Sequence, residues 1–169
     1  MASVILLGQG PSMSGCPFDK ETWAAVSVLS HKGWEDKPYS KLFCFDDPQN
    51  KQDEMIGLQR AQERHIPIVG MKINHYYPSV KDSFVTEDFP LVELQKKYNT
   101  FYFKNDASYM IAYAIHLGYK HLSLWGIDQS GIETYTMARP YVMFWLGVAT
   151  GAGITWELCP TSQLLRKED

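Results

Sequence analysis

Short apolar runs alternate along this chain with longer segments in which apolar residues recur at helical spacing. Runs of consecutive apolar side chains are typical of strands buried on both faces, and apolar residues three or four apart indicate amphipathic helices. Strands are predicted at residues 4–7, 42–45, 66–70, 122–128 and 154–158. Helices are predicted at residues 19–30, 54–64, 106–117 and 139–149. Residues 74–99 interrupt the alternation and are expected to form a long excursion with one short helix. Residues 100–103 are expected to form the end of a strand.

Strands that alternate with helices are typical of a parallel sheet covered by helices on both faces. No internal repeat, low-complexity tract or interdomain linker divides the 169 residues. The sequence therefore predicts one α/β domain over residues 1–169, a single Rossmann-like three-layer sandwich with a mostly parallel sheet.

Composition and charge narrow the function classes. A formal net charge of -3 and basic runs no longer than pairs such as Lys96-Lys97 argue against a nucleic-acid-binding surface. No apolar stretch has membrane-spanning length and no signal-peptide pattern opens the chain, so a cytoplasmic protein with no membrane contact is expected. The 3 cysteines are widely spaced and suggest neither a disulfide framework nor a zinc cluster, and no metal or other cofactor is expected.

The first predicted strand runs directly into the turn Gly8-Gln9-Gly10-Pro11-Ser12. Two glycines allow a tight turn and a close approach of a ligand, and the N–H groups of such a turn can point at a phosphate. Neither a third glycine at dinucleotide-binding spacing nor the Lys-Ser/Thr pair of a P-loop follows. A plain strand-to-loop turn is the alternative.

Ligands of open parallel sheets bind outside the carboxyl ends of the strands, where the strand order reverses. Polar residues follow three of the predicted strands: the Gly8 turn, then Asp46 and Asp47, then Asp128. The pair Asp46-Asp47 is a candidate for a ribose hydroxyl or a metal, although Asp before Pro48 also initiates ordinary turns. Asp128 is a candidate ligand contact or a cap for the following segment.

The opening turn, residues 108–114 and residues 118–128 together resemble the nucleotide-binding half of Campylobacter-type sialyltransferases. The Gly-x-Gly-Pro-Ser opening is also similar to that of pterin pyrophosphokinase-like proteins. A resemblance that runs nearly end to end links the chain to small uncharacterised bacteriophage proteins. It rests on residues 102–103, 108–110, 126–128, 139–140, 147–154 and 160–165.

These resemblances imply a nucleotide or nucleotide-derived small molecule as the partner, and the cytoplasm of an infected bacterial host as the setting. In the sialyltransferases the nucleotide contacts come from the opening turn, from the start of the following Tyr-Met helix and from tyrosines beyond the Gly-Ile-Asp strand. The matching positions here are Gly8, Gln9, Gly10, Ser12, Asn105, Ser108 and Tyr135.

The sialyltransferases place their catalytic histidine after the Gly-Ile-Asp strand, whereas all 5 histidines of this chain precede Asp128. A general base must reach the acceptor hydroxyl, so this departure leaves the catalytic residue unassigned, with His75 on the excursion as a candidate. Arg139 is a candidate for clamping a phosphate, and an ion pair with Glu133 is its alternative. The aromatic final helix favours a core or subunit-interface role, so a homo-oligomer is an open expectation.

Three function classes follow. The first is a phage-type protein that binds and sequesters a nucleotide or a nucleotide-derived small molecule. The second is a glycosyltransferase that uses an activated nucleotide-sugar, which the resemblance favours and the position of the histidines does not. The third is a phage morphogenesis or interaction protein with a vestigial site. Binding without established catalysis is the preferred hypothesis, and whether the protein is an enzyme stays open.

Overall fold

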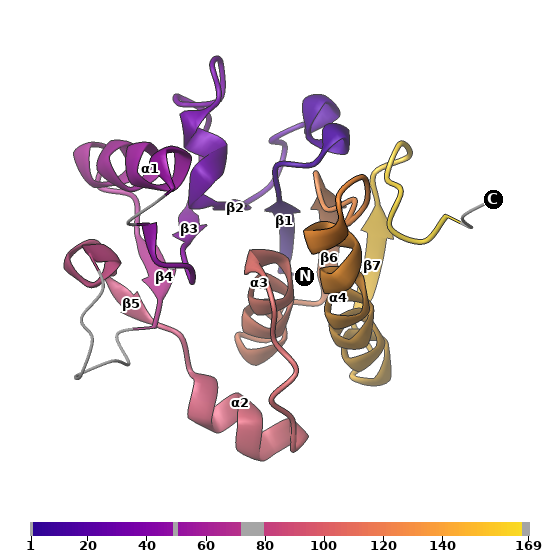
Figure 1. Ribbon diagram of the computed structural model, residues 1–169. Coiled ribbons are helices and arrows are strands. Elements are labelled where there is room, and N and C mark those ends of the chain that lie inside the picture. The colour runs from indigo at the N-terminus through magenta and orange to yellow at the C-terminus, as the bar shows by residue number, and fades with distance from the viewer. Residues whose placement is uncertain (1, 49–50, 72–79, 167–169) are drawn as a thin grey trace.

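A computed structural model describes residues 2–48, 51–71 and 80–166 of the protein. They form one sheet of seven parallel strands in the order β5-β4-β3-β2-β1-β6-β7 (Figure 1). The strands are β1 (Ser3–Leu7), β2 (Thr22–Ala25), β3 (Lys41–Phe43), β4 (Ile68–Gly70), β5 (Glu87–Asp88), β6 (His121–Trp125) and β7 (Thr155–Leu158). The α/β prediction of a Rossmann-like sandwich is confirmed.

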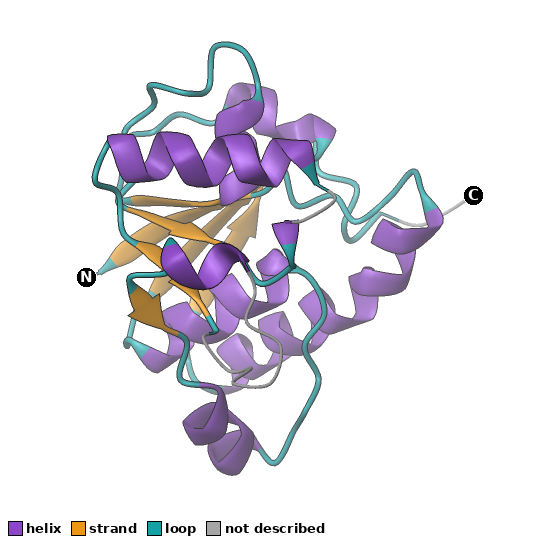
Figure 2. Ribbon diagram, turned by 60° about the vertical axis from the view of Figure 1, so that its left-hand side comes forward, coloured by secondary structure: helices purple, strands orange, loops and turns teal. Residues whose placement is uncertain are grey.

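Helices cover both faces of this sheet, so that the strands form the middle of three layers (Figure 2). The α-helices are α1 (Gln52–Glu63), α2 (Leu91–Tyr98), α3 (Asp106–His116) and α4 (Glu133–Gly151). Short 3-10 helices lie at Pro11–Gly15, Val26–Ser30 and Val80–Ser83. Because successive side chains of a strand point to opposite faces, Leu6 packs into the core on the α3 and α4 side and Leu7 into the core on the α1 side.

The predicted helix at residues 19–30 is wrong. Its first part is strand β2, which pairs with β1 on one side and β3 on the other, and its second part is the 3-10 helix Val26–Ser30. All four residues of β2 are buried, since a central strand of a covered sheet has no solvent face. The apolar run from Trp23 to Leu29 fits a buried strand as well as a helix, and the pairing with two neighbouring strands decides between them.

Three other predictions shift in detail. The described part of the excursion contains the expected short helix, α2, together with strand β5, which is only two residues long. Residues 100–103 form no strand. Helix α4 begins six residues before the predicted start at 139, and Pro140 lies inside it rather than in its first turn.

The strand order reverses between β1 and β6. From β1 the chain adds β2, β3, β4 and β5 on one side of the sheet, and it then returns to place β6 and β7 on the other. The carboxyl ends of β1 and β6 therefore lie side by side at the switch point, since Leu7 pairs with Trp125 at the end of the two strands.

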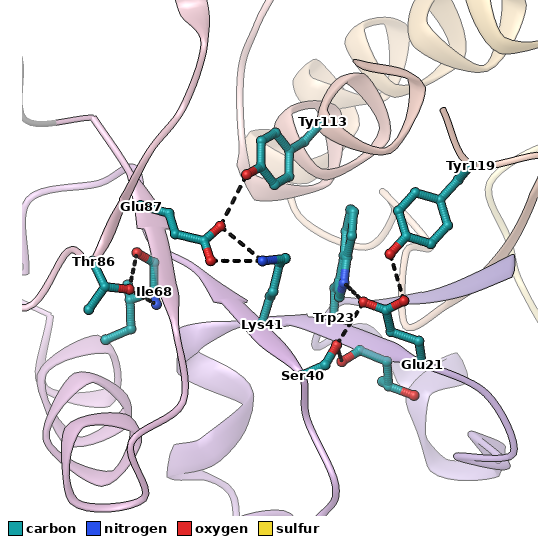
Figure 3. A network of polar contacts seen from close by, with 10 residues as sticks. Glu21, Trp23, Ser40, Lys41, Ile68, Thr86, Glu87, Tyr113 and Tyr119 are labelled. Atoms are coloured by element: carbon teal, nitrogen blue, oxygen red, sulfur yellow. Dashed lines mark hydrogen bonds and ion pairs between the residues drawn. The ribbon is translucent and has the colours of Figure 1, made fainter. Parts of the chain in front are cut away.

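A polar network fixes α3 against the opposite edge of the sheet, where the strands begin (Figure 3). Glu87 accepts two hydrogen bonds from the Lys41 ammonium, at 2.8 and 2.9 Å, and one from the Tyr113 hydroxyl at 3.1 Å. Glu21 accepts one from the Tyr119 hydroxyl at 2.6 Å. Burial and the charge of Glu87 raise the pKa of Tyr113 to about 12, so its hydroxyl stays a donor at neutral pH.

Candidate functional site

A pocket of about 290 Å³ lies at the switch point, outside the carboxyl ends of β1 and β6. This volume is near the lower end of the range found for small-molecule sites. The pocket is lined by residues 8–11, 105–107 and 126–132, with Ala25, Met110 and Tyr135. The structure thus brings together six of the predicted site residues: Gly8, Gln9, Gly10, Asn105, Asp128 and Tyr135.

The glycine turn after β1 packs directly on the turn after β6. The N–H of Gly8 donates to Trp125 O at 2.9 Å, and the N–H of Gly10 donates to Gly126 O at 2.7 Å. A Cβ added to Gly8 would lie 2.6 Å from Gly126 O, and one added to Gly10 would lie 2.8 Å from the same atom. The glycines are needed for this contact between loops.

This packing corrects one expectation about the turn. The N–H groups of Gly8 and Gly10 donate to backbone carbonyls of residues 125 and 126, and the Ser12 N–H donates to the Asp128 side chain. None of these three N–H groups is therefore directed at a phosphate. A contact between this turn and a nucleotide stays a prediction, and such a contact would have to use atoms of the turn other than these three N–H groups.

Asp128 joins three segments of the chain. Its Oδ2 accepts hydrogen bonds from the Ser12 N–H at 3.0 Å and from the Ser12 hydroxyl at 2.8 Å. Its Oδ1 accepts one from the Gln163 N–H at 3.0 Å, and the Ser12 oxygen accepts one from the Gly126 N–H at 2.9 Å. Asp128 is 3% exposed, and its carboxylate holds the two turns and the C-terminal segment together through these hydrogen bonds.

The start of α3 forms a second wall of the pocket. Asn105 caps the helix, because its side-chain oxygen accepts from the Ser108 N–H at 3.3 Å while its amide nitrogen donates to Gln129 Oε1 at 2.9 Å. The Ser108 hydroxyl is buried and donates to the Asn105 carbonyl at 2.9 Å. Asn105 therefore lines the pocket, and Ser108 supports it from behind without lining it.

Asp106 is a pocket residue that the sequence prediction missed. It is the first residue of α3 and lines the pocket. An acid is common at the start of a helix, so its presence there does not by itself indicate a binding site. Burial, followed by the charges of Asp46 and Glu54, raises the pKa of Asp106 to about 8. Lys51 and a hydrogen bond from the Phe45 backbone act in the opposite direction.

The turn after β6 and the start of α4 complete the pocket. Gln129 has a positive φ of 49°, the N-cap Ile132 makes no side-chain cap hydrogen bond, and Glu133 is an acid in the first turn of α4. Tyr135 lies one turn into α4 and is 41% exposed. Its side chain is therefore available to a ligand.

Four predicted residues do not line the pocket. Ser12 and Ser108 support it through the bonds described above, and the exposed Asp46 forms an ion pair with Lys51. Arg139 donates to carbonyls of the C-terminal segment: Nε to Leu164 O at 2.6 Å, and one Nη to Gln163 O at 2.8 Å and Arg166 O at 3.1 Å. Its predicted phosphate contact stays untested.

The catalytic candidate His75 lies outside the described residues. Within residues 2–48, 51–71 and 80–166 no three His, Cys, Asp or Glu side chains lie together as metal ligands would. The helices of that part of the chain are too short or too polar to cross a membrane.

No model of a known protein family matches the sequence, and neither does any curated protein sequence. Solved structures do match. The chain shares the fold of the sialyltransferase CstII. The Campylobacter jejuni enzyme in complex with cytidine-5'-monophosphate superposes with a TM-score of 0.67 at 19% identity, over 97% of this chain and 82% of CstII.

Two other CstII complexes give similar values. The complex with CMP-3FNeuAc has a TM-score of 0.66 at 18% identity, over 97% of this chain and 83% of CstII. The complex with a trisaccharide acceptor and CMP has a TM-score of 0.64 at 20% identity, over 96% and 83%. The predicted similarity to sialyltransferases is thereby confirmed for the fold, and the resemblances to bacteriophage and pterin pyrophosphokinase-like proteins stay predictions.

Proposed function

We propose that the protein binds a nucleotide or a nucleotide-derived small molecule in the pocket between the ends of β1 and β6. The observation that carries this proposal is the position of the pocket: it lies at the topological switch point and faces the N-terminal ends of both α3 and α4. Helix N-termini favour anionic groups through their unpaired N–H groups and the helix dipole.

The lining of the pocket suits a nucleoside with a small phosphate. Ile132 and Tyr135, which line the pocket and are exposed, offer apolar surface for a base or a sugar face. The side-chain amides of Asn105 and Gln129 are able to donate or accept hydrogen bonds. Both helices begin with an acid, Asp106 in α3 and Glu133 in α4, but Asn105 caps α3 whereas the N-cap of α4 makes no side-chain cap hydrogen bond, so the phosphate is placed at the α4 end.

The fold comparison supports the same ligand class. CstII has been solved with CMP and with CMP-3FNeuAc, so one protein of this fold holds cytidine nucleotides. At 19% identity the likeness supports the choice of CMP as the first probe.

Thermal shift and calorimetry test the proposal, with CMP first and then other nucleoside monophosphates, diphosphates and nucleotide-sugars. A ligand at a hundred times its dissociation constant adds about 2.7 kcal/mol, or roughly 5–10 °C for a chain of this size. Tyr135→Ala should weaken binding because Tyr135 lines the pocket, and Phe101→Ala is the matched control because Phe101 is an exposed aromatic outside it. Absence of any shift across the panel would contradict binding and favour a vestigial site.

A second candidate function is a transferase that uses a nucleotide-sugar. The specific observation is that His31 Nε2 lies 3.2 Å from Oε1 of Gln9, a pocket-lining residue, which brings a candidate general base beside the site. Donor consumption on the order of one turnover per second, abolished by His31→Gln or by His75→Gln, would support this function. His65→Asn is the matched control, since His65 lies outside the pocket at a positive φ of 54°, which Asn tolerates.

A further inference from the structure

The outward face of α4 is apolar and uncharged. Residues 140–151 of this helix contain no Asp, Glu, Lys or Arg, although Met143, Phe144 and Gly147 are exposed. Arg139, the last charged residue before them, donates to carbonyls of the C-terminal segment. Charged residues normally make up about a quarter to a third of the surface of a soluble domain. An exposed helix face without them is typical of a surface that another molecule covers.

Aromatic side chains from the segment before α3 enlarge this face. The Tyr102 ring stacks on the Tyr141 ring with centroids 4.0 Å apart, and it meets the Phe144 ring edge-on at 5.3 Å. Phe101, the preceding residue, is 83% exposed. Met137, one turn before Tyr141 on α4, is 55% exposed. These residues, Phe101, Tyr102, Met137, Tyr141 and Phe144, form the α4 patch.

The size of the α4 patch suits a second copy of the chain. At about 150–250 Å² for a large side chain, the exposed fractions of the patch and of the neighbouring Met143 amount to roughly 400–500 Å² of apolar surface. A stable dimer buries about 800 Å² on each partner, and about 65% of a homodimer interface is apolar, which is roughly 500 Å². The patch therefore supplies most of the apolar area that a dimer needs.

The charges of α4 favour a copy of the chain over a membrane as the occupant. A helix that lies on a membrane carries Lys and Arg beside its apolar face. The one cation of α4 is Arg139, whose guanidinium is bonded to the C-terminal segment, and the net charge of -3 opposes binding to anionic lipid. An uncharged face, by contrast, meets its own copy without like-charge repulsion.

The α4 face is also complementary to itself in shape. A glycine inside a helix is less stable than alanine, yet a Cβ added to Gly147 or to Gly151 would meet open space in the described structure. Packing within the described chain therefore does not require these glycines. A two-fold axis that crosses α4 between Phe144 and Gly147 sets each of these residues against the other in the second copy. The same axis sets Pro140 against Gly151, so a larger residue meets a glycine at both places.

We propose that the protein forms a two-fold symmetric homodimer through the α4 patch, with the two α4 helices antiparallel and Phe144 of each copy against Gly147 of the other. This dimer is independent of the proposed nucleotide binding. The pocket residue Tyr135 lies about two and a half turns before Phe144, and so on the opposite side of α4. The interface and the pocket therefore use different sides of the same helix.

Analytical ultracentrifugation of the full chain tests the dimer. At about 50 µM, above the micromolar dissociation constants of the weaker interfaces of this size, the wild-type protein should sediment as a dimer. Phe144→Arg brings like charges into the interface and should weaken the dimer about thirtyfold or more. Gly147→Gln fills the hollow without removing a contact within the chain, and it should weaken the dimer to a similar extent. Gln59→Arg is the matched control, because it adds the same charge at an exposed position of α1 on the other face of the sheet.

A wild-type protein that stays monomeric at this concentration overturns the proposal, and so does a dimer that neither Phe144→Arg nor Gly147→Gln weakens. Flotation with vesicles of phosphatidylcholine and phosphatidylserine is a second measurement. A monomeric wild type that floats, together with a Phe144→Arg variant that does not, assigns the patch to a membrane and overturns the dimer.

Melting curves of dilute protein, at about 1 µM, establish that the variants fold. Gly147→Gln should melt no lower than the wild type there, because its side chain meets open space in the separate chain. If Phe144→Arg does not fold, Gly147→Gln decides the test alone.

Discussion

The backbone N–H and the hydroxyl of Ser12 both donate to one carboxylate oxygen of Asp128, at 3.0 and 2.8 Å, across 116 positions of the sequence. The same oxygen lies where a Cβ of Gly10 would be, so the two turns are in close contact at this point. The hydrogen bonds therefore fix the distance between the turns after β1 and β6, which both line the pocket. The acid at the end of the Gly-Ile-Asp strand thus has a structural role whatever it contributes to a ligand.

Asp128→Asn should destabilise the protein by about 1.5–3 kcal/mol, because an amide can accept at only one end while the Ser12 and Gln163 N–H groups donate to both oxygens of Asp128. Urea unfolding measures the loss. Asp88→Asn, at an exposed acid, should stay within about 0.5 kcal/mol of wild type. Equal effects of the two substitutions would remove the structural role of Asp128.

Gly10→Ala should destabilise the protein by about 1–3 kcal/mol, since the added Cβ would lie 2.4 Å from Asp128 Oδ2 and 2.8 Å from Gly126 O. Gly147→Ala is the matched control: it lies in α4 with open space around the added methyl group, and it should stabilise by about 0.5–1 kcal/mol. A neutral Gly10→Ala would show that the two turns can separate without cost.

The raised pKa of Asp106 predicts a stability that depends on pH. The folded state keeps the proton up to about pH 8, whereas the unfolded chain releases it near 3.8, so stability falls as pH rises through that interval. Asp106→Asn removes this loss and should melt about 2–4 °C above wild type at pH 8.5, with little difference at pH 4.

Comparing the variant with wild type over the same pH range controls for the titration of the neighbouring groups. Asp46, Glu54 and Lys51 set the field around Asp106 and remain in the variant, so their own titration is shared by both proteins. A difference in melting temperature that stays constant from pH 4 to pH 8.5 would show that folding does not shift the pKa of Asp106.

Arg139→Ala should loosen the C-terminal segment, because the guanidinium donates to the carbonyls of Gln163, Leu164 and Arg166. We expect a loss of about 1.5–3 kcal/mol and faster proteolysis of the tail, with cytidine and CMP affinities reduced alike. Lys120→Ala, at an exposed cation, serves as the control. A loss confined to CMP would instead restore the phosphate contact predicted for Arg139.

The sequence was informative where local signals and tertiary structure agree. Glycines and acids at strand ends located the turns of Gly8 and Gly10 and the position of Asp128, because the carboxyl ends of parallel strands meet at one edge. It could not show that these residues face one another, since that contact depends on the order of β1 and β6 in the sheet. The glycines were therefore predicted for a ligand, while the structure shows them needed for loop packing.

Other features were not predicted because the contacts that define them are distant in sequence. Asp106 looks like an ordinary helix-start acid, and its pKa is raised by burial and by Asp46 and Glu54, which are distant from it in sequence. The sequence predicts a helix in place of strand β2 because a fully buried strand has no alternation of apolar and polar residues to mark it. Both misses come from neighbours distant in sequence, which a single chain does not display.

The bond between Ser12 and Asp128 has a consequence for biosynthesis. At roughly 5–20 residues per second, the ribosome adds the 116 positions that separate these residues in roughly 6–23 s. Throughout that interval β1 has no β6 beside it and the turn after Leu7 has no partner, and the Gln163 N–H that completes the Asp128 carboxylate comes 35 residues later still. The nascent chain thus has strands β1 to β5 long before it has a pocket, and ligand can stabilise only molecules whose synthesis has passed β6.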